Sequence, residues 1–159
     1  MKKAIKRILV LLFAAVFVSL LLPEFKTSDF FNGTIFNVSG IMFSLGLGLV
    51  ATFNLNSVKN KSYIVDIRKN LNEVRNWFIF YFGITVLCYI LNNSLRDMGV
   101  NSLHIANIKN LQVKLNLTVL FCTSIFYSIV YYIINFLSIQ KLNNDILDKV
   151  LKEEEESHE

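Results

Sequence analysis

The sequence has little charge and little proline for a chain of its length. Only 18% of its 159 residues are charged and proline occurs once, whereas 53% are hydrophobic. A soluble domain carries roughly 25% charged residues and distributes them along amphipathic helices or strands. Here four long runs contain no Asp, Glu, Lys, Arg or His: residues 8–22, 35–53, 77–91 and 115–139. This pattern excludes an ordinary soluble domain and indicates a membrane protein.

Motifs for catalysis are also missing. The sequence contains no HExxH zinc motif, no glycine-rich phosphate loop and no nucleophile with a plausible base. Its two histidines, His104 and His158, are separated by the fourth uncharged run. If that run crosses a membrane, the histidines lie on opposite sides and cannot share a metal ion. We therefore expect no enzymatic activity, no cofactor and no metal site.

The uncharged runs also argue against coupled transport. Proton-coupled transporters depend on an ionisable group inside the membrane, and none of the four runs provides one. Neither an inverted repeat nor a helix broken by proline at mid-membrane is evident. Transport of this kind is therefore disfavoured.

The sequence contains four apolar runs that are long enough, or nearly long enough, to form transmembrane helices. At 1.5 Å per residue, about 20 residues cross a hydrocarbon core of roughly 30 Å. The runs at 8–22 and 77–91 are short, so their spans must include flanking residues. Because backbone groups in lipid must hydrogen-bond to one another, we predict a single all-α integral membrane domain over residues 1–159.

The first run also has features of a secretory signal, because a basic amino terminus precedes an apolar core. However, no convincing small-x-small cleavage site precedes Pro23. We favour an uncleaved span. Cleavage would leave three spans and an external amino terminus.

The basic residues predict the orientation. Most of the 16 Lys and Arg residues lie before the first run, between the second and third, and after the fourth. By the positive-inside rule these segments are cytoplasmic, and so are both termini. The net charge of +4 then reflects topology and gives no reason to expect direct nucleic acid binding. Frequent Lys, Asn, Ile and Phe hint at an AT-rich bacterial genome, so we expect the bacterial inner membrane.

The second run is expected to be the packing seam of the molecule. It carries a stripe of small residues at four-residue spacing, formed by Gly40, Ser44 and Gly48 and continued by Ala51. In lipid there is no water to expel between helices, so a stripe that permits close backbone approach favours association. We predict that the other spans are arranged about this stripe and that it forms the seam of a homo-oligomer.

Polar and thiol groups inside the runs have more than one interpretation. Asn37 lies near the start of the second run, and a ladder in the fourth includes Ser124, Ser128 and Asn135. Such groups usually form hydrogen bonds between helices, but the same residues could line a narrow aqueous pore. Cys88 and Cys122 are expected to be buried free thiols, because disulfides seldom form inside hydrocarbon.

Two helical extensions into the cytoplasm are predicted. Apolar residues at helical spacing over residues 58–76 run into the third span, so the third helix should begin near Tyr63 and continue without a break. A similar stripe continues the fourth span over residues 140–152, and the two extensions could pair as a stalk. The basic residues of the first extension are candidates for contact with lipid headgroups or a soluble partner: Lys59, Lys61, Arg68, Lys69 and Arg75.

The longest external segment is predicted to be residues 92–114. Its many apolar residues make it unsuitable as a free loop. We expect either a short amphipathic helix on the outer surface or a segment packed over the ends of the spans.

Four spans, two cytoplasmic ends, a basic segment before the third span and a charged helical tail form a recognisable architecture. It resembles the small membrane subunits of bacterial phage-exclusion and phage-defence systems of the Rex and Kiwa types. The resemblance covers the whole chain but is architectural, and no diagnostic motif transfers a residue role. It implies an inner-membrane oligomer that works with a cytoplasmic partner during infection.

Three functions follow from this reading. The first is a non-catalytic membrane sensor or scaffold that self-associates and engages a cytoplasmic protein. The second is an effector whose oligomer opens an ion-conducting, depolarising pore. The third is a holin-like lesion former, which is disfavoured because holins are usually shorter and less aromatic.

Overall fold

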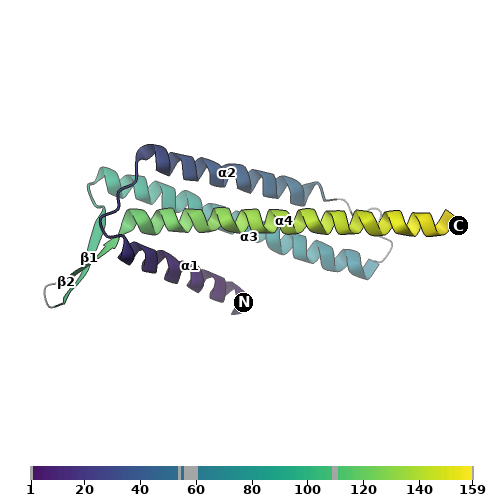
Figure 1. Cartoon of the computed structure of the whole chain (residues 1–159), viewed down its shortest axis with the longest axis horizontal. Helices are drawn as coiled ribbons and strands as arrows, with labels where there is room; N and C mark the ends of the chain where they lie inside the picture. The colour runs from purple at the N-terminus through teal and green to yellow at the C-terminus, as the bar shows by residue number, and fades with distance from the viewer. Residues whose placement is uncertain (1, 54, 56–60, 109–110, 159) are drawn as a thin grey trace.

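The computed structural model describes the chain except residues 1, 54, 56–60, 109–110 and 159. For residues 2–7, 106–108, 111–113 and 151–158 it describes the backbone alone. Within these bounds the chain forms four helices and one pair of strands (Figure 1). In chain order they are α1 (Lys2–Leu21), α2 (Asp29–Ala51), α3 (Lys61–Asp97), β1 (Ser102–Ile108), β2 (Leu111–Asn116) and α4 (Leu117–His158).

Three of the described helices are long and apolar enough to cross a membrane: α2, α3 and the part of α4 up to Val150. The apolar part of α1, Ile8–Leu21, is shorter than these. The predicted all-helical membrane class is therefore supported for three spans, and a fourth span would require α1 to cross with help from flanking residues.

Helices α3 and α4 extend well past the width of a bilayer. They contain 37 and 42 residues, which corresponds to about 55 and 63 Å at 1.5 Å per residue. Their apolar stretches account for only part of that length, so a helix of this kind that crosses a bilayer extends beyond the hydrocarbon core. The prediction that the third helix begins near Tyr63 and continues unbroken is confirmed, because α3 begins at Lys61.

The projecting parts of α3 and α4 pack against each other. Ile67 and Leu71 of α3 share a buried cluster with Ile139 and Ile146 of α4. Near the far end of this pair, the Lys149 ammonium lies 5.8 Å from the centre of the Tyr63 ring. The predicted pairing of the two extensions is thus present within one chain. We call this paired region, residues 61–75 with 139–150, the stalk.

Helix α4, and not α2, occupies the centre of the bundle. It packs against each of the other three helices, and Figure 1 shows it running the length of the molecule between them. Its face around Ile125, Ile129 and Tyr132 is almost fully buried. The prediction that the other spans are arranged about the small-residue stripe of α2 is therefore wrong within the monomer.

The face of α2 that packs in the bundle carries Asn32, Ile35, Ser39 and Gly46. Gly46 lies against the fully buried ring of Phe78, and a Cβ added to this glycine would overlap that ring. Asn32, Ser39 and Gly46 are each seven positions apart, which is close to two helical turns. This spacing keeps one face of the helix toward its neighbours. The helix is thus rotated relative to our expectation.

The segment after α3 forms a β-hairpin, so the first of the two alternatives for residues 92–114, a short amphipathic helix, is wrong. Helix α3 continues to Asp97, and Gly99, at φ 75°, turns the chain out of it. Strands β1 and β2 then pair antiparallel, with a bulge between His104 and Ala106. The alternation of Leu111, Val113 and Leu115 with polar residues has the period of two that a strand requires.

The same correction moves the start of the fourth helix. Leu115 and Asn116, which the uncharged run 115–139 assigns to the fourth span, are the last residues of β2. Asn116 caps α4: its Oδ1 atom accepts a hydrogen bond from the Val119 backbone N–H at 3.1 Å. The helix therefore begins at Leu117.

Candidate functional site

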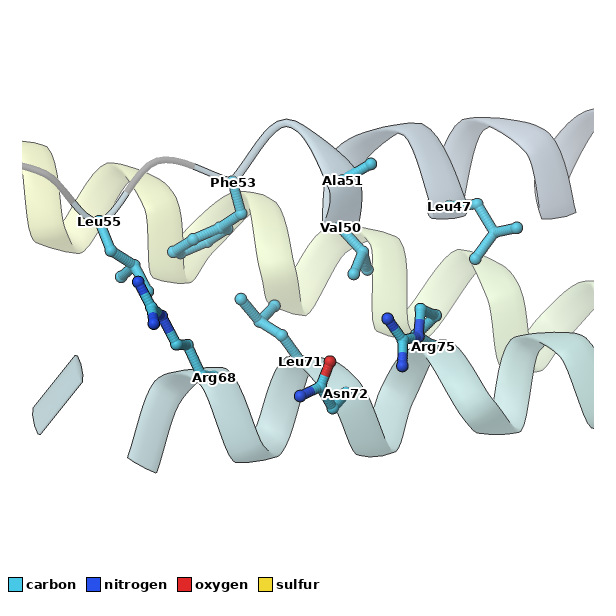
Figure 2. A pocket seen from close by; sticks show the side chains of 9 residues that line it. All are labelled: Leu47, Val50, Ala51, Phe53, Leu55, Arg68, Leu71, Asn72 and Arg75. Atoms are coloured by element: carbon cyan, nitrogen blue, oxygen red, sulfur yellow. The ribbon is translucent and has the colours of Figure 1, made fainter. Parts of the chain in front are cut away.

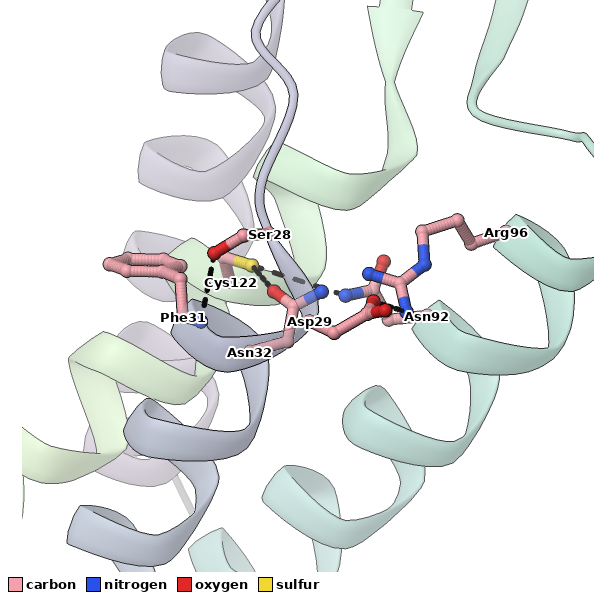
Figure 3. A network of polar contacts seen from close by, with 7 residues as sticks. All are labelled: Ser28, Asp29, Phe31, Asn32, Asn92, Arg96 and Cys122. Carbon is pink, nitrogen blue, oxygen red and sulfur yellow. Dashed lines mark hydrogen bonds and ion pairs between the residues drawn. The ribbon is translucent and has the colours of Figure 1, made fainter.

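The two ends of the bundle differ in construction, and each holds a candidate site. At the end beside the hairpin, polar side chains from different helices meet (Figure 3). At the other end of α2, a cavity opens against the stalk (Figure 2). Between them, the small-residue stripe runs along the outside of α2.

Asn116 forms hydrogen bonds to several segments at the hairpin end of the bundle. Its Nδ2 atom donates to the carbonyl oxygens of Leu22, Pro23 and Phe25 at 3.1, 3.3 and 2.8 Å. The Ser19 hydroxyl, at the end of α1, donates to the backbone oxygen of Asn116 at 2.6 Å. One buried asparagine thereby joins α1, the loop after it and the start of α4.

A second polar cluster joins α2, α3 and α4 below the hairpin. The Cys122 thiol donates to Oδ1 of Asn32 at 3.2 Å, and Asn92 Nδ2 lies 4.0 Å from the Cys122 sulfur (Figure 3). All three side chains are buried. An ion pair between Asp29 and Arg96 lies beside them, but Asp29 is largely exposed, so the pair adds little to stability. Cys122 and the half-buried Cys88 are free thiols.

Further polar atoms are buried deeper in the bundle. Ser39 Oγ, Thr85 Oγ1 and Asn32 Nδ2 have no hydrogen-bond partner among the described residues. With Asn92, these residues follow the interior faces of α2 and α3 at two-turn spacing. Buried polar groups in native proteins usually bind a partner or an ordered water, so this polar column is the part of the interior best suited to hold water.

The polar residues singled out from the sequence are only partly brought together. Ser124 and Ser128 are buried in the bundle interior, whereas Asn37 is exposed on the outside of α2. The hydroxyls of Ser124 and Ser128 donate to the backbone oxygens of Leu120 and Ser124, one turn earlier in the same helix. Half-buried Asn135 likewise donates to its own helix, at Tyr131. These three hydrogen bonds lie within α4 and do not join it to another helix.

The predicted seam residues lie on the open side of α2. Ser44, Gly48 and Ala51 are exposed and Gly40 is half-buried. A Cβ added at Gly40 or at Gly48 would meet no atom within 4 Å. We call Gly40, Ser44, Gly48 and Ala51 the open stripe. No helix of the described chain covers it.

The cavity at the end of α2 has a volume of about 500 Å³. One wall comes from α2 and the residues just after it, and the other from α3 (Figure 2). Nine residues line it: Leu47, Val50, Ala51, Phe53, Leu55, Arg68, Leu71, Asn72 and Arg75.

The basic residues of the predicted first extension do not all lie at the same site in the structure. Arg68 and Arg75 line the cavity, and Figure 2 shows their guanidinium groups directed toward the α2 side. Lys61 and Lys69 are exposed and are not part of its lining. Lys59 falls outside the described residues. The cavity is not predictable from the sequence, because it depends on how α2 and α3 are rotated toward each other.

In the part of the chain that the structure describes, no group of three His, Cys, Asp or Glu residues is close enough to hold a metal ion. His104 lies on the exposed hairpin, and the helix that ends at His158 terminates at the far end of the molecule (Figure 1).

The fold and these sites define a helical bundle of the membrane-protein class, with an interior polar column, an open stripe of small residues and a cavity lined by two arginines. Comparison of the chain with protein-family models, with curated proteins and with solved structures finds no match.

Proposed function

We propose that this protein is a non-enzymatic membrane scaffold that self-associates through the open stripe of α2 and presents its stalk to a partner on one side of the bilayer. The observation that carries the proposal is the exposure of the stripe. The small residues of the open stripe are not covered by another described helix. Bulky exposed side chains of α2, such as Val38, Ile41 and Leu45, lie on either side of them.

The open stripe is also chemically suited to close helix packing. Ser44 donates its hydroxyl to the Gly40 backbone oxygen at 2.9 Å, and Thr52 donates to the Gly48 oxygen at 2.9 Å. The hydroxyls are therefore already satisfied within α2. A second helix can approach this shallow surface without leaving either hydroxyl unpaired in lipid.

The stalk supports the scaffold part of the proposal. It is held together by its own apolar cluster, so its outer faces remain available. Those faces carry exposed charged residues of both signs, including Lys61, Asp66 and Lys69. A rigid, charged helix pair beyond the bilayer is a suitable surface for a soluble partner.

The proposed setting is the bacterial inner membrane, with both termini and the stalk in the cytoplasm. The excess of Lys and Arg in residues 1–7, 59–75 and 141–152 supports this orientation. The architectural resemblance to phage-defence membrane subunits adds anti-phage defence as the proposed role. Survival of expressing cells after phage challenge, with and without the gene, tests that role directly.

One observation favours a second candidate function, a depolarising pore. The polar column that includes Ser39 and Thr85 runs inside a single bundle, where a hydrated path could form. Ion flux through purified protein in liposomes separates the two functions, because a scaffold conducts no ions.

Self-association is tested by counting subunits in lipid nanodiscs or by cross-linking in membranes. We expect Gly48→Ile to weaken the oligomer and Gly40→Ile with Gly48→Ile to abolish it, because β-branched side chains would fill the shallow surface. The monomer should remain inserted and folded, since a Cβ atom at either position would have no atom of another helix within 4 Å.

The matched control is Gly83→Ile on α3. Gly83 is also exposed, and a Cβ there would likewise meet no atom within 4 Å. It lies off the open stripe, so the control variant should retain the wild-type subunit count. An oligomer that persists in the double variant would refute self-association through this stripe.

A further inference from the structure

The cavity between α2 and α3 combines two cations with an apolar wall (Figure 2). On the α3 side, Arg68 and Arg75 are separated by seven residues, so they lie on one face of the helix, about 10 Å apart along its axis. Asn72 stands between them on the same wall. The lining includes no acidic residue, and within the described residues neither guanidinium forms an ion pair.

Two unneutralised arginines directed at one cavity favour an anionic ligand. A guanidinium group offers a fork of N–H donors that matches the oxygens of a phosphate, and the amide of Asn72 adds a neutral donor. A volume of about 500 Å³ is within the usual range for sites that hold small molecules.

The position of the cavity along the helices narrows the class of anion. Leu47 and Val50 belong to the last turns of the uncharged stretch of α2, which places their wall at hydrocarbon depth. Arg75 is the last charged residue of α3 before the uncharged run at 77–91, which places Arg75 at headgroup depth and Arg68 two turns farther from the hydrocarbon. The ligand must therefore have a charged part and an apolar part in contact with the two walls.

We propose that this cavity binds one anionic phospholipid, with its phosphate held by Arg68 and Arg75 and its acyl chains against the α2 wall. Basic pockets between helices at the cytoplasmic surface are typical sites for such headgroups. All the lining residues come from a single chain, so a monomer can bind the lipid, although Ala51 belongs to both the cavity and the open stripe.

Native mass spectrometry of the purified protein tests the proposal, with phosphatidylglycerol as the probe and phosphatidylcholine as the neutral reference. The wild type should retain one phosphatidylglycerol in preference to phosphatidylcholine. Arg68→Gln with Arg75→Gln should weaken phosphatidylglycerol binding by roughly tenfold to thirtyfold, as expected for the loss of two cations near a headgroup.

The matched control is Lys61→Gln with Lys69→Gln, which removes the same charge from the same helix outside the cavity. Its phosphatidylglycerol binding should stay within about twofold of the wild type, and far-ultraviolet circular dichroism should show that both variants are folded. Equal loss in the two variants would mean diffuse attraction to anionic lipid and would overturn the site. Competition by millimolar inorganic phosphate would instead identify a soluble phosphate ligand and overturn the lipid assignment.

Discussion

The two faces of α2 are built from similar residues but have different surroundings. The buried face carries Asn32, Ser39 and Gly46, each seven residues after the last, and it packs against α3 and α4. The open face carries Asn37 and Ser44 at the same spacing, next to Gly48, and no helix of the described chain covers it. At 100° per residue, the centres of the two faces are roughly 160° apart around the helix axis.

This difference shows that small residues permit close packing without specifying where it occurs. Gly46 is packed because α3 places the large ring of Phe78 opposite it. Gly48, two residues later, faces away from every described helix. The composition of a stripe is therefore insufficient, and the complementary side chain on the neighbouring helix decides which face is buried.

The largest expected effect is at Gly46. Gly46→Ala should lower the free energy of unfolding by about 2 to 3 kcal/mol, because the added Cβ overlaps the Phe78 ring and that ring is fully buried. Reversible unfolding in mixed micelles measures this change. Gly48→Ala on the open face is the matched control and should change stability by less than about 0.5 kcal/mol.

A double-mutant cycle identifies the cause. Phe78→Leu removes the ring atoms that the new Cβ would meet, so it should cost less in the Gly46→Ala background than in the wild type. If the two losses simply add, the close approach of Gly46 to Phe78 does not determine the packing of α2.

Much of the helical architecture was predictable from the sequence. The spacing of Ile67 and Leu71 before the third run predicted one long helix, and α3 begins two residues before Tyr63. These features depend on the local period of apolar residues, which a single segment carries by itself.

Features that depend on the relative rotation of helices were not predictable in the same way. The cluster of Asn32, Asn92 and Cys122 takes one residue from each of three helices. The cavity likewise needs α2 and α3 together. The hairpin is a different case, because the alternation of apolar and polar residues in β2 is a local signal that the sequence carries.

The second comparison pairs the asparagines of the two faces. Asn32→Ala should lower the free energy of unfolding by about 1 kcal/mol, because it removes the acceptor of the Cys122 thiol inside the bundle. Asn37→Ala on the open face should change it by less than about 0.5 kcal/mol, since Asn37 is exposed. Both are measured by the same unfolding assay under monomeric conditions. Equal losses would mean that burial does not distinguish the two asparagines.

The smallest effects are expected for the serines. Ser44→Ala loses a hydrogen bond within α2, and Ser39→Ala removes a buried hydroxyl that has no partner among the described residues. Because an unsatisfied buried hydroxyl is costly, Ser39→Ala should be neutral or should raise the free energy of unfolding by up to about 1 kcal/mol. Ser44→Ala should change the free energy of unfolding by less than about 0.5 kcal/mol. A loss of more than about 1 kcal/mol for Ser39→Ala would contradict this expectation, because the hydroxyl would then have a hydrogen-bond partner. That result would identify ordered water in the polar column and would shift the balance from a scaffold toward a hydrated path through the bundle.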